Sequence, residues 1–420
     1  MTSSRAMAIL IVAYRSVDKL EKCLLSIENY LPNQGIHIWD NSGADFPGIR
    51  ELAEHNQDIN WYFSDQNIGF AAAVNKLAAT VPDHDLLLLN PDAELIEPLT
   101  LTRAAINEPG VAAVAPMVWL PGDHKERLRL FSNRRVPWDA AFRRLRILNL
   151  LGGAAGLGVR FRGTPFSYLY RKQPDQVDGF LFGACLAICR EAWDSVGPFD
   201  EEFFLYQEEA EWQRRATSAG WRLRLADEIG VRHIPRGTVS GDLDRSTRSD
   251  DLAFAGTVLL VEYCYGLRVA EFYLVWATVI ESIKRRIRGQ RVDVSPCPNV
   301  IITADGDSNV VGERVSTALT LAQAGYSVTF VSLQRLGNVP RDLPPSIRLI
   351  RRPWWWPSLA SRASLSVLVM GSTRKERAFA RLFRLGRNRT CIDASNLVGG
   401  LAEVVGNHTG TPSKLRPDEG

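Results

Sequence analysis

Short apolar runs alternate with stretches of helical period in the N-terminal part of the chain. Ala8–Ala13 reads AILIVA and Leu86–Leu89 is wholly leucine; such continuous runs are typical of strands buried on both faces. Gly35–Asp40 and Ile59–Phe63 predict two further strands. The segment after Ser16 has helical spacing of its leucines, and Ser16 is expected to cap it. Strands that alternate with helices predict an α/β domain with a mainly parallel sheet.

The same alternation returns near the C-terminus. A loop, Asp305–Asn309, follows the first of these strands, and Gly325 ends the helix after it. The predicted strands and helix, in chain order, are Val300–Ala304, Val311–Ala324 (the helix), Ser327–Leu333, Leu365–Met370 and Thr390–Asp393. This pattern predicts a second, smaller Rossmann-like α/β domain.

The chain between these two parts has a different pattern. A polar stretch, SGDLDRSTRSDD, is interpreted as a linker, and Leu252–Arg288 predicts two helices. Pro296 and Pro298 then mark a boundary. The expected organisation is a first domain over 1–240, a helical extension over 241–295, the Rossmann-like domain over 296–405 and a disordered tail over 406–420.

Composition places the chain among ordinary globular proteins. It has 420 residues, 45 % hydrophobic and 23 % charged, with a net charge of +3, and that charge is too small to indicate nucleic-acid binding. The six cysteines contain no C-x-x-C pair, which favours reduced thiols. The N-terminal apolar run is too short for a signal peptide, and no apolar run near the middle of the chain reaches the ~20 residues that span a bilayer. We therefore expect a cytoplasmic protein.

Polar residues follow the predicted strands. Tyr14, Asp40, Asn90 and Asp92 stand where strands of the first domain end, and ligands of parallel sheets bind at that edge. Asp40 could accept hydrogen bonds from a base or sugar, and Asp92 could ligate a hard divalent cation. The alternative is that these are ordinary turn and capping residues.

A cluster of carboxylates opens a later helix. Phe199–Arg215 reads FDEEFFLYQEEAEWQRR, with Glu208, Glu209 and Glu211 at the start of the helix. Mutual repulsion raises the proton affinity of such groups, and the neighbouring aromatic residues would favour a general base. Glu208 and Glu211 are expected on one helix face and Glu209 on another. A solvated acidic first turn is the alternative.

These motifs together resemble family 2 glycosyltransferases. The segments that carry the resemblance are IVAYRS, WDNSGAD, NIGFAAAVN, LLLLNPDAEL, VDGFLFGACLAICREAW and FDEEFFLYQEEAEWQRR. Over roughly residues 7–290 the chain is most similar to the rhamnosyltransferase-like branch, which builds bacterial cell-surface glycans. The resemblance implies a glycosyltransferase A-type nucleotide-binding domain, a nucleotide-sugar donor, Mg²⁺ or Mn²⁺, and inversion at the anomeric carbon.

The resemblance also assigns roles to residues. Glu209 matches the general base, with Glu208 as the other candidate, and Asp92 with His233 matches the metal or diphosphate site. Asn90 replaces the first aspartate of the family's Asp-x-Asp motif. The implied donor-binding residues are Ala13, Tyr14, Asp40, Asn67, Gly69, Asn75 and Asn90, and Gly183 and Ala184 are small enough for an acceptor to approach closely.

The implied reaction moves a sugar to a lipid-linked or growing bacterial surface polysaccharide. The best match is L-rhamnose from dTDP-rhamnose; another nucleotide sugar such as UDP-galactofuranose is an alternative, as is an inactive glycan-binding or scaffold protein. The Rossmann-like domain weakly resembles the N-terminal half of a B-type glycosyltransferase.

Two segments suggest contact with a membrane or an anionic partner. Asp123–Gly163 is basic and rich in aromatic residues, which fits anionic lipid, an acceptor diphosphate or a solvated loop. The second predicted helix ends in IKRRIR, which fits the inner surface of a membrane or a packing helix with a cationic end. Trp354–Trp356 cannot all be buried if the segment is extended. The protein is thus expected to be peripheral to the inner face of the cell membrane.

Overall fold

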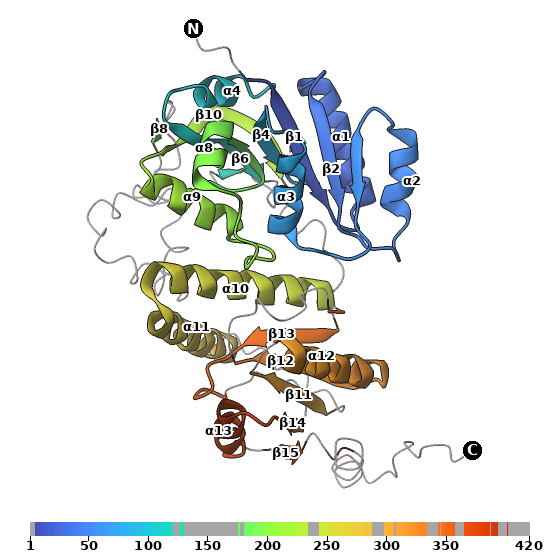
Figure 1. Cartoon of the computed structure of the whole chain (residues 1–420), viewed down its shortest axis with the longest axis vertical. Coiled ribbons are helices and arrows are strands. Elements are labelled where there is room, and N and C mark those ends of the chain that lie inside the picture. Colours follow the sequence, from blue (N-terminus) through green and yellow to red (C-terminus); the bar gives the residue numbers. More distant parts are fainter. Residues whose placement is uncertain are drawn as a thin grey trace. The chain divides into compact units, whose positions relative to one another are not determined.

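The computed structural model divides the chain into two compact units, Met1–Leu243 and Asp244–Gly420 (Figure 1). It describes residues 5–120, 127–129, 175–176, 180–233, 243–287, 298–305, 308–333, 343–344, 346–357, 365–386, 388–393 and 401. Apart from 127–129, the basic segment of residues 123–163 lies outside the described residues, as does the tail of residues 406–420.

The first unit is built on a mixed sheet of ten strands. Its main path runs β3-β2-β1-β4-β9-β6-β10-β5, with β7 paired to β6 and β8 to β10. The strands are β1 (Met7–Ala13), β2 (Gly35–Asp40), β3 (Asn60–Phe63), β4 (Asp85–Leu89), β5 (Ala93–Leu95), β6 (Val111–Leu120), β7 (Arg127–Arg129), β8 (Asp175–Gln176), β9 (Cys185–Ile188) and β10 (Arg222–His233). The α/β class is therefore confirmed.

Parallel pairing covers only part of this sheet. β3, β2, β1 and β4 are parallel, as the sequence predicts for these four strands. β9 is antiparallel to both β4 and β6, and β5 is antiparallel to β10. β5 follows β4 after the short turn at Asn90–Asp92, so no helix crosses between them and no parallel β4–β5 unit forms.

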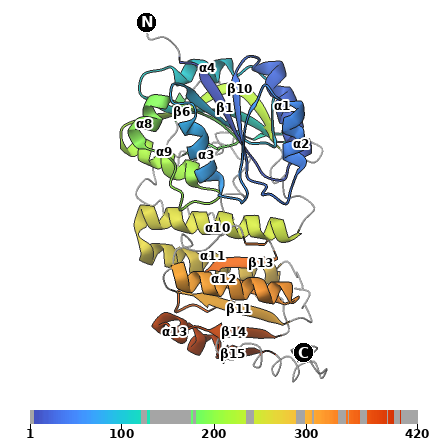
Figure 2. The same ribbon diagram turned by 45° about the vertical axis from the view of Figure 1, so that its right-hand side comes forward.

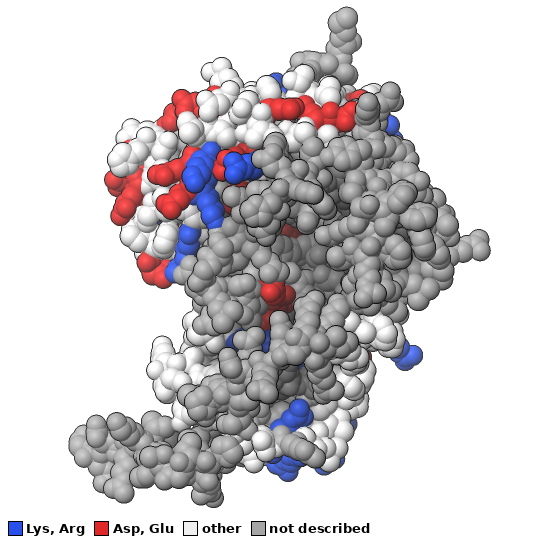
Figure 3. Space-filling view, turned by 180° about the vertical axis from the view of Figure 1, so that it is seen from behind, with Lys and Arg blue, Asp and Glu red and all other residues white. Residues whose placement is uncertain are grey.

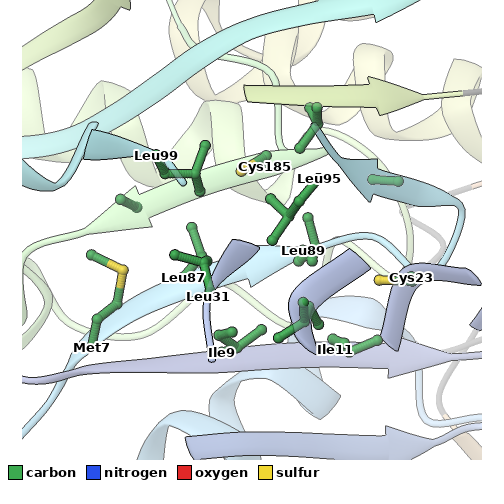
Figure 4. Packing of buried hydrophobic residues seen from close by; sticks show 14 of the residues in the cluster. Met7, Ile9, Ile11, Cys23, Leu31, Leu87, Leu89, Leu95, Leu99 and Cys185 are labelled. Atoms are coloured by element: carbon green, nitrogen blue, oxygen red, sulfur yellow. The ribbon is translucent and has the colours of Figure 1, made fainter. Parts of the chain in front are cut away.

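Helices cover both faces of the sheet, as Figure 2 shows. They are α1 (Val17–Tyr30), α2 (Gly48–His55), α3 (Phe70–Ala79), α4 (Thr100–Ile106), α8 (Arg190–Val196) and α9 (Glu208–Ser218). One core cluster joins residues of α1, α2 and α4 to the sheet, and Figure 4 shows part of it around Ile9, Ile11 and Leu87. A second cluster packs α3, α8 and α9 on the opposite face. The sheet is therefore buried on both sides, which explains the continuous apolar runs of β1 and β4.

The expected cap of the first helix is only partly present. Ser16 occupies the N-cap position of α1, but its side chain makes no capping hydrogen bond. Its backbone carbonyl accepts from the Leu20 N–H at 3.0 Å, while its buried Oγ has no hydrogen-bond partner. Prediction of a side-chain cap at Ser16 was wrong, because the residue's φ of −133° and ψ of 52° lie outside the extended region that N-cap residues usually adopt.

A buried arginine fastens α3 to the sheet. The Arg190 guanidinium donates to the backbone carbonyls of Ala78 (3.1 Å), Val81 (2.8 Å) and His84 (3.0 Å). Its backbone N–H donates to Asp85 Oδ1 at 2.8 Å. The cation thus satisfies carbonyls at the C-terminus of α3, where the helix dipole also favours positive charge.

Acidic and basic side chains of the first unit are interspersed on the face shown in Figure 3.

The second unit contains a five-stranded sheet in the order β13-β12-β11-β14-β15. Its strands are β11 (Asn299–Ala304), β12 (Ser327–Ser332), β13 (Ile347–Arg351), β14 (Ser366–Met370) and β15 (Arg389–Asp393), and every pairing is parallel. α12 (Ser308–Gln323) packs on one face and α13 (Arg374–Phe383) on the other. This strand order confirms the Rossmann-like prediction.

The second unit also holds a helical hairpin. α10 (Leu243–Tyr265) and α11 (Leu267–Ile287) turn at Gly266, whose φ is +86°. The two predicted helices are confirmed, but α10 begins within the stretch interpreted as a polar linker, and that interpretation was wrong. Its polar residues have partners instead: Arg248 donates to the Leu343 carbonyl at 2.8 Å and Asp251 accepts from Arg348 at 2.9 Å.

These contacts assign the hairpin to the C-terminal unit. Glu262 of α10 accepts from Arg351 of β13 at 2.9 Å, and both side chains are less than a tenth exposed. Glu271 of α11 accepts from the Trp355 indole at 3.1 Å. Removal of the strands would leave the Asp251 and Glu262 carboxylates without these partners, which is costly for a buried charge.

Truncation should reveal this division. We expect residues 1–243 to give a soluble protein with one cooperative unfolding transition. Residues 1–295 should aggregate, because the hairpin would be retained without the sheet that pairs its carboxylates. Size-exclusion chromatography and thermal unfolding of both fragments check this, and equal behaviour of the two fragments would contradict it.

Candidate active site

The predicted site residues gather at one edge of the large sheet. β1, β2, β4 and β10 end there, and β9 begins there because it runs antiparallel to β4. Ala13 pairs in register with Asp40, and His233 pairs with Ala93, next to Asp92. This edge is where parallel sheets bind ligands.

The end of β2 forms a buried polar turn. The Asp40 carboxylate accepts from the Ser42 N–H at 2.8 Å and is 1 % exposed. Burial raises the pKa of Asp40, and the hydrogen bonds from Ser42 oppose that rise. Arg15, beside Tyr14, donates to the Ser42 carbonyl at 3.2 Å and to Asp45 at 2.6 Å, with its guanidinium 5.8 Å from the centre of the Tyr14 ring. The loop after β1 is thereby fixed to the loop after β2.

Gly69 lies in a close contact that only glycine fits. Its φ is +90°, and a Cβ there would lie 2.6 Å from Phe204 Cδ2 and 2.8 Å from the Phe204 carbonyl oxygen. That carbonyl accepts from the Phe70 N–H at 2.7 Å. Asn67 Oδ1 accepts from the Gly69 N–H at 2.9 Å, and the Asn41 amide donates to the Gly69 carbonyl at 2.9 Å. The Asn67–Phe70 turn is therefore held against the segment that precedes α9.

Asn75 makes a second link to that segment. Its Oδ1 accepts from the Phe199 N–H, and its Nδ2 donates to the Phe199 carbonyl, both at 2.9 Å. Nδ2 also lies 3.0 Å from Glu201 Oε1. The structure thus uses the Asn75 amide to position the 199–201 backbone, and its predicted donor-binding role stays a prediction.

The predicted acceptor residues lie beside the Asn90–Asp92 turn. The Ala184 carbonyl accepts from the Asn90 N–H at 3.0 Å. A Cβ on Gly183 would come within 3.3 Å of Glu209 Cγ. Gly183 and Ala184 therefore stand between the end of β4 and the acidic start of α9, two places far apart in sequence.

Glu208 and Glu209 form a coupled pair of carboxyl groups. Glu208 is 3 % exposed, whereas Glu209 is partly exposed. Burial and the charge of Glu209 raise the pKa of Glu208 well above its usual value. Burial also raises the pKa of Glu209, but hydrogen bonds from its own backbone, from Glu208 and from the backbone of Gln207 and Gly183 oppose that rise. Both pKa values are therefore raised, and the hydrogen bonds that favour the ionised form act mainly on Glu209.

Glu211 has a different role from its two neighbours. Its carboxylate, 3 % exposed, accepts from Arg215 at 2.8 Å and from Arg214 at 3.1 Å. Glu208 and Glu211 are both buried while Glu209 is partly exposed, as helix periodicity predicts. Tyr206 and Gln207, with φ of 70° and 78°, turn the chain into α9 through a conformation that side chains rarely adopt. Such backbone strain concentrates at functional sites.

Asp92 and His233 meet across 141 positions of sequence. His233 Nε2 lies 3.1 Å from Asp92 Oδ1, and both side chains are less than a tenth exposed. Phe182 packs edge-on against the imidazole at 5.6 Å between ring centres. His233 Nδ1 is buried and has no hydrogen-bond partner. A carboxylate oxygen and an imidazole nitrogen are ligand types that fit a divalent cation. Because Nε2 is the nitrogen that faces Asp92, an ion shared by the two side chains would replace their hydrogen bond.

Metal ligands from the protein are few here. Over the described parts of the chain, no group of three or more His, Cys, Asp or Glu residues has a metal-binding arrangement. Mg²⁺ commonly uses one or two protein ligands together with substrate phosphates and water. The pair Asp92–His233 fits that mode of binding and would not form a closed structural site.

One residue at this edge, Phe182, was missed by the sequence analysis, because an aromatic side chain there is equally typical of a core. Asn41 was recognised from the sequence only as a polar residue at a strand end. It is 2 % exposed and its Oδ1 accepts from the Trp39 indole at 3.1 Å and the Ile68 N–H at 3.3 Å.

The arrangement brings a pair of carboxyl groups and a carboxylate–imidazole pair to one edge of the sheet, as a group-transfer enzyme acting on a phosphorylated donor requires. No family model matches the chain. Over 233 residues it is 25 % identical to the N-acetylglucosaminyl-diphospho-decaprenol L-rhamnosyltransferase of two Mycobacterium tuberculosis strains, CDC 1551 / Oshkosh and H37Rv. The match covers 50 % of this chain and 70 % of the relative. The resemblance to a rhamnosyltransferase is thus confirmed.

Two solved structures show a more distant likeness. GalNAc-T7 with UDP, GalNAc and Mn²⁺ is 15 % identical with a TM-score of 0.43, covering 62 % of this chain and 48 % of that one, so the chain spans about half of its length. The mannosyltransferase PcManGT from Pyrobaculum calidifontis with GDP-Man and Mn²⁺ is 14 % identical with a TM-score of 0.40, covering 77 % and 81 %. Likenesses at these scores support no functional statement.

Proposed function

We propose that the first unit is an inverting, metal-assisted glycosyltransferase. The observation that carries the proposal is the Glu208–Glu209 pair beside Gly183, at the same sheet edge as the Asp92–His233 pair. A sugar hydroxyl is a poor nucleophile, so a carboxylate must take its proton as it attacks. A leaving diphosphate develops negative charge, which must be stabilised on the other side of the reacting carbon.

Glu209 is the base in this proposal. Its Oε2 is buried and lacks a hydrogen-bond partner, so it can accept a hydrogen bond from an acceptor hydroxyl. Protonated Glu208 donates to the Glu209 carboxylate and keeps it ionised despite its burial. Gly183 lets the acceptor approach the base, since a side chain there would occupy the space in front of Glu209.

Asp92 and His233 would hold a Mg²⁺ or Mn²⁺ ion. When bound, the cation neutralises charge on the donor diphosphate. In this proposal Asp40 and Tyr14, at the ends of β2 and β1, contact the nucleotide, and Asn67, Gly69 and Asn90 contact the rest of the donor. This assignment keeps the donor roles predicted from sequence.

The proposed substrates follow from the sequence relative. The name of that relative describes transfer of L-rhamnose to a decaprenol-linked diphosphate sugar. We therefore assign dTDP-rhamnose as the donor and a polyprenyl-diphosphate-linked glycan as the acceptor, which places the reaction at the membrane in cell-wall biogenesis. No helix of the described residues is both long and apolar enough to cross a membrane. A lipid-linked acceptor lies at the membrane surface, so in this proposal the chain contacts that surface during transfer.

The test is a thermal-shift screen with dTDP-rhamnose, UDP-galactofuranose, UDP-glucose and GDP-mannose, with and without Mg²⁺. A donor that binds the folded state raises the unfolding midpoint by mass action. We expect a Mg²⁺-dependent rise with dTDP-rhamnose, followed by slow release of dTDP. A response to no donor would reject the function and favour a glycan-binding scaffold.

Asp92→Ala should remove the metal dependence of donor binding. The change deletes the carboxylate beside His233, which leaves one imidazole to hold the ion. We expect donor affinity in Mg²⁺ to fall at least about tenfold, to the value measured in chelator. Calorimetric titration with dTDP-rhamnose measures it, and Asp83→Ala, at an exposed carboxylate just before β4 and so at the opposite edge of the sheet, is the matched control. An unchanged Mg²⁺ titration would refute the role of Asp92.

A further inference from the structure

Large apolar side chains are exposed together on the second unit. They lie at the α10–α11 turn, along α11 and just after β13. The members are Tyr265, Leu267, Phe272, Ile283, Trp354 and Trp355, each between 36 % and 54 % exposed. We call these six residues the aromatic patch. Patches of this kind mark interaction sites.

The patch is continuous over its aromatic part. The Trp355 indole donates to Glu271 at 3.1 Å, which joins the segment after β13 to α11. Leu267 lies one turn before Glu271, and Phe272 directly follows it. Trp354 adjoins Trp355, whose ring lies 6.4 Å from that of Trp356. Two separate segments of the unit therefore present one surface.

The surface continues along the helix to a basic end. Phe272, Trp276, Val279 and Ile283 follow one another at spacings of three or four, so they share one face of α11. Trp276 and Val279 are partly exposed. The last turn of the helix contains Lys284, Arg285 and Arg286 in sequence. α11 therefore has an exposed apolar face, opposite the buried face that contains Tyr273 and Leu274, and its sequence ends in basic residues.

We propose that the aromatic patch docks the second unit on an anionic lipid bilayer, with α11 lying in the plane of the interface. Tryptophan and tyrosine favour the boundary between water and hydrocarbon because their rings are apolar and carry a polar group. Basic residues at the end of such a helix are attracted to anionic headgroups. The combination of aromatic and basic residues is the reason for choosing an anionic bilayer as the partner. This inference rests on the proposed function, in which the acceptor is lipid-linked.

Docking would bring the enzyme to its acceptor. A lipid-linked acceptor is confined to the membrane, so a chain bound to the same surface meets it at a raised effective concentration. The contact needs no residue of the Glu209 site. Loss of the patch should therefore lower transfer to acceptor in vesicles while leaving hydrolysis of the donor in solution unchanged.

The experiment uses the full chain and vesicles of phosphatidylcholine with or without phosphatidylglycerol. We expect co-sedimentation with the anionic vesicles, weakened by salt, and a blue shift of tryptophan fluorescence. Phe272→Ser with Trp354→Ser should reduce vesicle affinity at least about tenfold, since two large apolar side chains no longer enter the interface. Leu385→Ser, at an 83 % exposed leucine of the same unit outside the patch, is the control and should bind normally.

Three results would overturn the inference. They are absence of binding by the unchanged chain, equal binding by the double variant, and a patch-dependent dimer in size-exclusion chromatography, which would mean that a second copy covers the patch. Donor hydrolysis is measured on the same samples. If the unchanged chain hydrolyses the donor but does not bind vesicles, only the docking surface is rejected. If the unchanged chain does not hydrolyse the donor, the proposed function is rejected.

Discussion

Glu209→Gln is expected to abolish sugar transfer while donor affinity stays within about twofold of the original. The substitution keeps the shape of the side chain and its packing against Gly183 but removes the group that accepts the proton. General-base catalysis contributes about 10²–10⁴-fold, so the turnover number should fall by that factor with little change in the KM for donor. Initial rates with dTDP-rhamnose and a lipid-linked acceptor measure it.

Two variants separate the base from its neighbours. Glu208→Gln should keep substantial activity, because the amide can still donate to the Glu209 carboxylate, as the protonated acid does. Glu211→Gln should weaken the ion pairs to Arg214 and Arg215, and so affect stability more than rate. If Glu208→Gln were inactive and Glu209→Gln active, the base would be Glu208.

The same pair makes stability depend on pH. Burial and the charge of Glu209 raise the folded-state pKa of Glu208 well above its value in the unfolded chain, so the folded protein keeps a proton that the unfolded chain has released. Stability from this group is complete below the unfolded pKa and is lost as pH rises toward the folded pKa. Glu208→Gln cannot ionise, so its unfolding free energy should fall less than that of the original protein when the pH is raised from 5 to 8. Urea unfolding at both pH values compares the two proteins.

Arg190→Met is expected to cost the first unit about 3–5 kcal/mol of stability. The methionine fills part of the space, but the carbonyls of Ala78, Val81 and His84 lose their donors in a buried environment. The midpoint of thermal unfolding should drop by roughly 10 °C for a unit of this size.

A surface arginine provides the control for that prediction. Arg50 lies 3.9 Å from Asp65, with 44 % and 92 % of the two side chains exposed. Arg50→Met should change stability by less than about 1 kcal/mol, as exposed pairs usually do. Similar losses for Arg50→Met and Arg190→Met would show that the guanidinium of Arg190 does not anchor α3.

Strands were predicted most reliably from the sequence where both of their faces are buried. AILIVA and LLLL are buried on both faces, so their strands could be recognised without knowledge of the sheet around them. β10 was missed because RLRLADEIGVRH mixes charged with apolar residues. Its partners, such as Glu108 for Arg224, lie far away in sequence. The polar start of α10 was missed for the same reason, because Arg248 and Asp251 bind Leu343 and Arg348, which are almost a hundred positions away in sequence.

The site shows the same division. The polar residues at strand ends were recognised one by one, because the edge of a parallel sheet collects them. Their pairing was not predictable: Asp92 meets His233 only because β5 and β10 are antiparallel, and Glu209 meets Gly183 only because β9 starts at this edge. The local sequence of an antiparallel strand does not indicate which other strand of the sheet it pairs with.

The links from Gly69 and Asn75 to the 199–206 segment have a kinetic consequence. The turn proposed to follow the nucleotide and the loop that leads into the base are joined by the Phe70–Phe204 hydrogen bond and by the Asn75 amide. A donor that settles against the first must therefore set the position of the second. The enzyme should follow a compulsory order, in which nucleotide sugar enters before acceptor and the nucleoside diphosphate departs last.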